Sequence, residues 1–210
     1  MAIQGWKASA AYRARRILGA IPGVAFHRYV LVAVPVAAMP PALSAGLHGA
    51  ACPPEAAIAA GLTDPVAAAW RTRQGMDCVG LWRRDVLIAV TWLGEGAFDE
   101  DEAWLTFKAP AGEAWDTGMQ IAEGARGGRA FAALWAATRG WAQARGIGWS
   151  VSRIADYNIV SRRAHARLGA VEVGRVSVLR VGDWQVCSGA RPRVMRVGGV
   201  RAVVQVRVPQ

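Results

Sequence analysis

Two basic segments of the chain have residue types that suit binding of an anion at the start of a helix. Residues 126–134 read Arg-Gly-Gly-Arg-Ala-Phe-Ala-Ala-Leu, and residues 158–170 read Asn-Ile-Val-Ser-Arg-Arg-Ala-His-Ala-Arg-Leu-Gly-Ala. The first turn of a helix has unpaired N–H groups and a partial positive charge, and glycines let that backbone approach a ligand closely. Arg126 and Arg129 add bidentate donors for phosphate. Segment 126–134 therefore indicates a diphosphate site, and the alternative is a surface turn with two solvated arginines.

The flanking pattern places this segment between a strand and a helix. Residues 115–122 alternate with period two, which is typical of a strand. Apolar residues between 131 and 145 share one face of a helix, and Gly146 is a stop signal. We therefore predict a strand over 115–122 and a helix over 127–145.

The second segment predicts a short helix over 159–168, and it contains one residue suited to proton transfer. Asn158 precedes this helix and can cap it. Ser161, His165 and Leu168 are spaced so that they share one helix face. An imidazole can donate a proton near neutral pH, whereas the alternative is a partly buried structural histidine.

Taken together, the two segments resemble the GNAT superfamily of N-acyltransferases. Members carry an Arg/Gln-x-x-Gly-x-Gly/Ala turn whose amides hold the diphosphate of coenzyme A. Further along they carry Asn-x-x-Ala/Ser-x-x-Leu-Tyr-x-x-x-Gly-Phe on the next helix. Here Asn158, Ser161, His165 and Gly169 lie at the matching offsets, and the resemblance is strongest over residues 75–185.

This resemblance implies transfer of an acetyl or other acyl group from acyl-CoA to a small-molecule or peptide amine. His165 would protonate the departing thiolate, at the position where the family usually has a tyrosine. The backbone of residues 119–121 would donate hydrogen bonds to the tetrahedral oxyanion. The residues that the resemblance assigns to acyl-CoA are Met119, Gln120, Ile121, Arg126, Gly127, Gly128, Arg129, Ala130, Phe131, Asn158 and Ser161.

Besides His165, three positions depart from the family pattern. Arg129 stands where the first motif glycine is usual, Phe131 stands where a glycine or alanine is usual, and Ala170 replaces a phenylalanine. Side chains at 129 and 131 would narrow the approach of the backbone to a phosphate. Two alternatives therefore stay open: a transferase that uses an acidic acyl carrier protein as donor, and a non-catalytic binding protein with the same fold.

The composition favours one globular domain over residues 1–210, with 1–23 and 191–210 as peripheral extensions. Hydrophobic residues make up 53% of the chain and charged residues 19%, which excludes a disordered protein. Predicted strands pair antiparallel at first and are later joined by helices. We therefore expect an α/β (α+β) fold, of the kind found in the GNAT family, whose mixed antiparallel/parallel sheet carries helices on both faces.

The charge of the chain is uneven. The net charge is +10, and residues 124–210 hold 15 arginines and three acidic residues. This excess suits an anionic partner such as acyl-CoA or an acyl carrier protein, and the alternative is a bias in coding composition. No recognisable nucleic-acid module is present, so no nucleic acid is expected. Residues 94–114 are predicted to be a long loop, in which the acidic run 99–102 is either solvated or attracts a cationic amine.

The remaining features exclude several classes of protein. The three cysteines and three histidines lack metal-ligand spacing, so no metal is expected, and odd, distant cysteines indicate a cytoplasmic protein. Residues 29–54 contain no Asp, Glu, Lys or Arg, but five prolines favour a strand and loop over a transmembrane segment. The last twenty residues are predicted to form a valine-rich hairpin around Gly198-Gly199.

Overall fold

The computed structural model describes residues 17–18, 20–126 and 129–209. The chain divides into two units, and each is assembled from segments that are far apart in sequence. Unit 1 comprises residues 1–33, 97–110 and 153–210, whereas unit 2 comprises residues 34–96 and 111–152. The diphosphate segment therefore belongs to unit 2, and the segment with His165 belongs to unit 1.

Unit 2 contains the mixed antiparallel/parallel sheet that the sequence predicts. Five strands lie side by side in this sheet. The first four in spatial order pair antiparallel with their neighbours, and the fourth pairs parallel with the fifth. They are β2 (Leu47–Ala51), β3 (Asp77–Arg83), β4 (Val86–Glu95), β7 (Glu113–Ile121) and β8 (Trp149–Ala155), whose first four residues lie in this unit.

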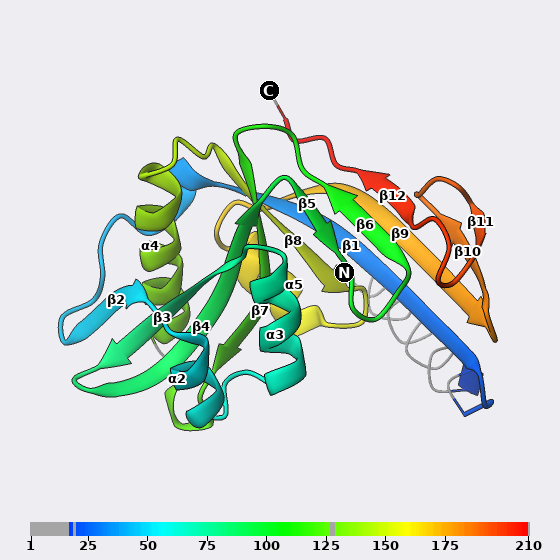
Figure 1. Ribbon diagram of the computed structural model, residues 1–210. Coiled ribbons are helices and arrows are strands. Elements are labelled where there is room, and N and C mark those ends of the chain that lie inside the picture. The colour runs from blue at the N-terminus through cyan, green and yellow to red at the C-terminus, as the bar shows by residue number, and fades with distance from the viewer. Residues whose placement is uncertain (1–16, 19, 127–128, 210) are drawn as a thin grey trace. The chain divides into compact units, whose positions relative to one another are not determined.

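Helices lie on both faces of this sheet (Figure 1). The three helices are α2 (Pro54–Ala59), α3 (Pro65–Arg73) and α4 (Ala130–Gln143). Leu81 of β3 packs in one cluster with Ala133 and Leu134 of α4. Cys78 of β3 lies opposite Trp92 of β4, whose ring is approached by an arginine of α3. Because residues three apart on a strand point to opposite faces, α3 and α4 cover different sides.

The two longer helices form for reasons visible in the sequence. The Asp64 carboxylate accepts hydrogen bonds from the backbone N–H groups of Val66 and Ala67 at 2.9 and 3.1 Å, so it caps α3. Gly75 ends this segment with a φ of +72°, which a glycine adopts without strain. Helix α4 buries the apolar stripe predicted for it: Ala130, Ala133, Leu134, Trp135, Thr138 and Ala142. Short 3₁₀ turns at Val36–Ala38 (η1) and Glu123–Ala125 (η2) complete unit 2.

Unit 1 is built around a long strand, β1 (Val24–Pro35), which pairs antiparallel with β9 (Val171–Val181). Strand β9 continues through a hairpin at Gly182 into β10 (Trp184–Ser188), which then pairs with β11 (Val194–Arg196). The last three residues of β8 lie on the other side of β1, and α5 (Ile159–Ala166) follows β8.

A second, three-stranded sheet in unit 1 corrects two predictions. It consists of β5 (Ala97–Asp99), β6 (Leu105–Lys108) and β12 (Ala202–Gln205), so the prediction of a loop over 94–114 was wrong. The prediction of a valine-rich terminal hairpin was also wrong, because β12 pairs parallel with β6 whereas β11 pairs with β10. Buried and less buried residues alternate along β5 and β6, which stabilises these short strands. The pairing of β6 with β12, about a hundred residues further along the chain, cannot be recognised from the sequence around either strand.

The acidic run is not a fully solvated loop, because Glu100 is buried and the run forms ion pairs with Arg153, although Asp101 and Glu102 remain exposed. Glu100 is 1% exposed and contacts the guanidinium of Arg153, which also lies 3.4 Å from Asp101 and from Glu102. The Tyr29 hydroxyl donates to Glu102 at 3.1 Å, and the Arg153 guanidinium stacks 4.7 Å from the Tyr29 ring centre. A buried charge is tolerated when it is paired in this way, and removing one partner is costly. Burial raises the pKa of Glu100 to about 8, although Arg153 lowers it.

This raised pKa predicts a pH dependence of stability. Since the ordinary pKa of a glutamate is 4.5, the folded protein holds the Glu100 proton more tightly than the unfolded chain does. The resulting stabilisation is full below about pH 4 and is lost as the pH rises towards about 8. We expect the free energy of unfolding of the wild type, relative to Glu100→Gln, to fall by up to about 1.4 kcal/mol per pH unit in this window. Urea unfolding of both proteins from pH 5 to 9 measures this difference in the free energy of unfolding. A difference that does not change with pH would contradict the prediction.

Candidate functional site

Strand β7 is fully paired on one edge only. It pairs with β4 from Glu95↔Ala114 to Ala89↔Ile121, but its parallel pairing with β8 ends at Asp116↔Ser152. Two irregularities lie just beyond that point. Gly118 has a φ of +62°, and the register against β4 shifts between Val90 and Trp92. The second half of β7, which includes residues 119–121, therefore differs in pairing and in backbone conformation from the first half.

A buried carboxylate joins three strands where the β7–β8 pairing ends. Asp116 accepts a hydrogen bond from the Ser152 hydroxyl of β8 at 2.9 Å and another from the Thr91 hydroxyl of β4. The Thr91 hydroxyl also lies 3.5 Å from the carbonyl oxygen of Thr117. All three side chains are buried. Because a buried carboxylate is stabilised by such donors, these bonds fix the position of β7 between its neighbours just before Gly118.

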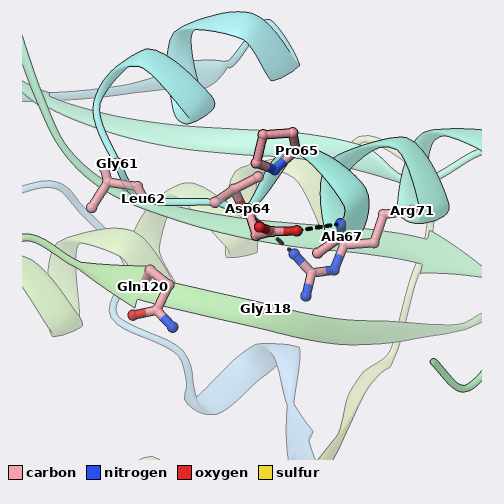
Figure 2. A pocket seen from close by; sticks show the side chains of 9 residues that line it. Gly61, Leu62, Asp64, Pro65, Ala67, Arg71, Gly118 and Gln120 are labelled. Carbon is pink, nitrogen blue, oxygen red and sulfur yellow. Dashed lines mark hydrogen bonds between the residues drawn. The ribbon is translucent and has the colours of Figure 1, made fainter. Parts of the chain in front are cut away.

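A pocket of about 570 Å³ opens beside this part of β7 (Figure 2). Residues 61–64 of the loop between α2 and α3 form one wall together with Pro65, Ala67 and Arg71 of α3. Gly118 and Gln120 of β7 form the other wall. The charged side chains of the lining are Asp64 and Arg71. The pocket thus combines a polar wall with a strand that has no side chain at Gly118.

The side chains of β7 separate into two groups. Gly118 and Gln120 line the pocket. Met119 and Ile121 instead pack against the α4 cluster that includes Leu134. Of the three β7 residues predicted to contact acyl-CoA, Gln120 alone therefore presents its side chain to the pocket, and the prediction for the other two concerns their backbone groups.

The turn before α4 carries the predicted diphosphate residues. Arg126 is exposed, and its Nε donates to the carbonyl oxygen of Ile121 at 3.1 Å, so the side chain bends back along the end of β7. Arg129 is exposed at the N-terminal boundary of α4, and Ala130 is buried at the first helical position. Phe131 is half-buried, with its ring 6.2 Å from that of Trp135. The predicted Gly127 and Gly128 lie outside the described residues.

The residues predicted on the second segment lie together on α5 in unit 1. The Asn158 carboxamide accepts a hydrogen bond from Ser161 N at 3.0 Å, which confirms the helix cap. His165 is buried, and its Nδ1 lies 2.8 Å from the carbonyl oxygen of Ser161 and 3.4 Å from the Ser161 hydroxyl. With Nδ1–H donating to that carbonyl, the ring is held in one orientation by its own helix.

Sequence reasoning missed Thr63, Arg71, Asp116 and Gly118. One local signal was present: Asp116 is the only ionisable residue of the predicted strand 115–122, and a carboxylate buried in a sheet requires hydrogen-bonding partners. Arg71 gave no comparable signal, because an arginine in the last turn of a helix is commonly solvated and favourable to the helix dipole.

Comparison with known proteins shows the fold of the chain. No family model and no curated protein matches the sequence. Solved structures do match: a GCN5-related N-acetyltransferase from Kribbella flavida, with a TM-score of 0.51 and 18% identity, and an acetyltransferase of the GNAT family from Colwellia psychrerythraea, with a TM-score of 0.50 and 16% identity. Each alignment covers 76% of this chain and 60% or 58% of the other protein, respectively.

A conserved protein of unknown function from Staphylococcus epidermidis also matches, with a TM-score of 0.54, 7% identity, and coverage of 81% of this chain and 66% of its own. The chain thus spans about three fifths of the length of these proteins and has the GNAT fold, an α+β fold with a mixed sheet. No helix of the described residues has the length and apolar character needed to cross a membrane.

The Asp116 cluster generates a stability prediction. Replacing Asp116 by alanine leaves the buried Thr91 and Ser152 hydroxyls without this acceptor, so we expect a loss of about 3 kcal/mol in the free energy of unfolding. Replacing Ser152 by alanine removes one of the two donors and should cost about 1 kcal/mol. Urea denaturation measures both values. Equal costs for the two variants would show that Asp116 is not the centre of the cluster.

Proposed function

We propose that this chain is an N-acyltransferase that moves an acetyl or other acyl group from acyl-CoA to an amine acceptor. The observation that carries the proposal is the pocket against the second half of β7, where parallel pairing with β8 has ended and Gly118 leaves the backbone bare. The GNAT fold and the resemblance of segments 126–134 and 158–170 support the same activity. The acceptor amine would enter this pocket, next to the backbone of residues 119–121.

The start of α4 is suited to the diphosphate of an acyl-CoA. Helix α4 spans 14 residues and has no acidic residue in its first turn, so the partial positive charge at its N-terminus is not neutralised there. Arg126 and Arg129 are exposed beside it. Of the two departures from the family pattern in this turn, Phe131 is half-buried, whereas Arg129 stands at the N-terminal boundary of α4. The Arg129 guanidinium can therefore add hydrogen-bond donors to a phosphate bound there.

The chemistry would proceed by attack of the neutral amine nitrogen on the thioester carbonyl carbon. The C–N bond forms, and the negative charge on the carbonyl oxygen is stabilised by backbone N–H groups of Met119, Gln120 or Ile121. The C–S bond then breaks, the nitrogen loses a proton, and the thiolate gains one. We assign donation of that last proton to His165, whose ring is oriented by its bond to Ser161.

Two further properties belong to this proposal. The acceptor is a small molecule or a peptide that carries an amine, and an acidic acyl carrier protein is the alternative donor. The enzyme would act in a reducing compartment such as the cytoplasm, since Cys52, Cys78 and Cys187 are free thiols. Burial raises the pKa of each of these thiols, which keeps them protonated and inert.

The diphosphate assignment predicts a loss of affinity on removal of its two arginines. Arg126→Ala combined with Arg129→Ala should weaken acyl-CoA binding by about 2–4 kcal/mol, because charge-assisted hydrogen bonds contribute about 1.5–3 kcal/mol each and add incompletely. Calorimetry with acetyl-CoA, longer acyl-CoAs and acyl carrier protein measures it. The control is Arg73→Ala with Arg83→Ala, which removes the same charge from exposed positions of the same unit.

Unchanged acyl-CoA affinity in the Arg126/Arg129 variant would remove this turn from the site. Wild-type protein that binds acyl carrier protein in a salt-sensitive manner, but not acyl-CoA, would instead support the carrier-protein donor. Tight acyl-CoA binding without release of thiol in the presence of any amine would favour a non-catalytic binding protein.

The role assigned to His165 predicts a defect in turnover. His165→Ala should lower turnover by about 10²–10⁴-fold with little change in acyl-CoA affinity, because the leaving thiolate loses its acid. His165→Tyr should restore part of the rate, since a phenol can donate a proton at the same position. Turnover and the melting temperature are measured on the same variants. A lower melting temperature with an intact rate per folded molecule would show that the histidine is structural.

A further inference from the structure

The pocket beside β7 is built around one guanidinium. Arg71 and Asp64 are its charged lining residues, and the Asp64 carboxylate already accepts two backbone hydrogen bonds at the start of α3. Arg71 projects from α3 towards β7, on the opposite side of the pocket (Figure 2). Arg71 therefore supplies the permanent positive charge of the lining, and the carboxylate of Asp64 is engaged at the start of α3.

Two aromatic and polar contacts hold this guanidinium in place. Its carbon atom lies 5.7 Å from the ring centre of the buried Trp92, within the range of a cation–π contact. Its Nη1 lies 3.5 Å from the Thr63 hydroxyl, which also accepts a hydrogen bond from Trp92 Nε1 at 3.2 Å. Thr63 and Trp92 thus orient the planar fork, which has five N–H donors and can serve more than one acceptor.

Strand β7 is shaped to accommodate the same group. A Cβ atom at Gly118 would lie 2.5 Å from the guanidinium carbon of Arg71, closer than real side chains pack. The φ of +62° at Gly118 is also one that residues with a Cβ rarely adopt. The bare backbone of Gly118 therefore lets the guanidinium lie directly against β7, immediately before the residues proposed to stabilise the oxyanion.

We propose that the acceptor is an amine bearing a carboxylate close to its nitrogen, such as an α-amino acid, and that Arg71 binds this carboxylate. This inference rests on the proposed function, in which the amine is acylated beside residues 119–121. A carboxylate held at Gly118 lies about 7 Å along the strand from Gln120, so the amine must be only one or two carbons away from it. Diamines and other polycationic acceptors are disfavoured, because their second charge would face Arg71.

The transfer balances for this acceptor. The amine nitrogen of the amino acid forms a bond to the acyl carbon and loses one proton, the C–S bond breaks, and the thiolate takes up one proton. The products are an N-acyl amino acid and coenzyme A. The carboxylate takes no part in the bond changes, so Arg71 acts as a specificity-determining residue.

The test compares matched acceptors. Each of the twenty α-amino acids is assayed with acetyl-CoA for thiol release by the chain of residues 1–210. For every substrate, its primary amide and its decarboxylated amine are assayed beside it. We expect kcat/KM to fall by about 10–100-fold when the carboxylate is absent, which is the range of a bidentate charge-assisted hydrogen bond. Arg71→Lys and Arg71→Met should lose a similar factor with the amino acid and almost nothing with its amide.

Two variants make the test specific. Arg73→Met removes an arginine from the same helix that stacks on Trp70 at 5.5 Å and does not line the pocket, so it should leave kcat/KM unchanged. Gly118→Ala should displace the guanidinium and lower the preference for the carboxylate. Gly75→Ala is its control, because Gly75 has a similar φ of +72° but open space around its Cβ position. These glycine variants keep the test decisive if Arg71→Met does not fold.

The two proposals fail separately. Acylation of amides, decarboxylated amines or diamines as efficiently as of amino acids would overturn the inference and leave the acyltransferase function standing. Absence of thiol release, together with calorimetric binding of amino acids that Arg71→Met abolishes, would overturn the transferase function and support carboxylate binding by Arg71. Absence of both transfer and amino-acid binding would overturn both.

Discussion

The end of the parallel pairing between β7 and β8 is the constraint on which the candidate site depends. Asp116 is the last residue of β7 that pairs with β8, and its carboxylate accepts hydrogen bonds from Ser152 of β8 and Thr91 of β4. A buried carboxylate with two such donors is costly to move, so the point where the strands stop pairing is fixed. Beyond it, Gly118 departs from extended geometry and the backbone becomes one wall of the pocket.

The alternation of side chains along β7 lets this strand serve two purposes. Met119 and Ile121 pack against the α4 cluster and stabilise the sheet, whereas Gly118 and Gln120 face the pocket. The backbone that would stabilise an oxyanion is thereby held by buried apolar contacts on the opposite side. Donors that are fixed before the reaction require little reorganisation when charge develops, which is the usual source of electrostatic catalysis.

Part of the excess of arginines in the C-terminal half is explained by ion pairs within the protein. Arg153 and Arg201 have side chains that are 17% and 16% exposed, and both contact acidic residues of the segment 99–102. Arg28 pairs in a similar way with the buried Asp156 at 2.9 Å. These arginines are therefore held by acidic residues that lie far away in sequence. The charge available to an anionic partner is therefore concentrated in exposed residues such as Arg126 and Arg129.

The sequence alone determined the elements that depend on local chemistry. The apolar stripe of α4 and the Asn158 cap of α5 were both predicted, because periodicity and capping act over a few residues. The fold class followed from the resemblance of two motifs and from the order of these elements.

Only the tertiary structure decided the pairings between distant segments. The parallel pairing of β12 with β6, the burial of Glu100 against Arg153, and the position of Arg71 against Gly118 each join residues that lie far apart along the chain. The sequence predicted a hairpin and a solvated loop at the first two places, and no site at the third. Burial and long-range pairing depend on the whole sheet, and no short window of the sequence contains that information.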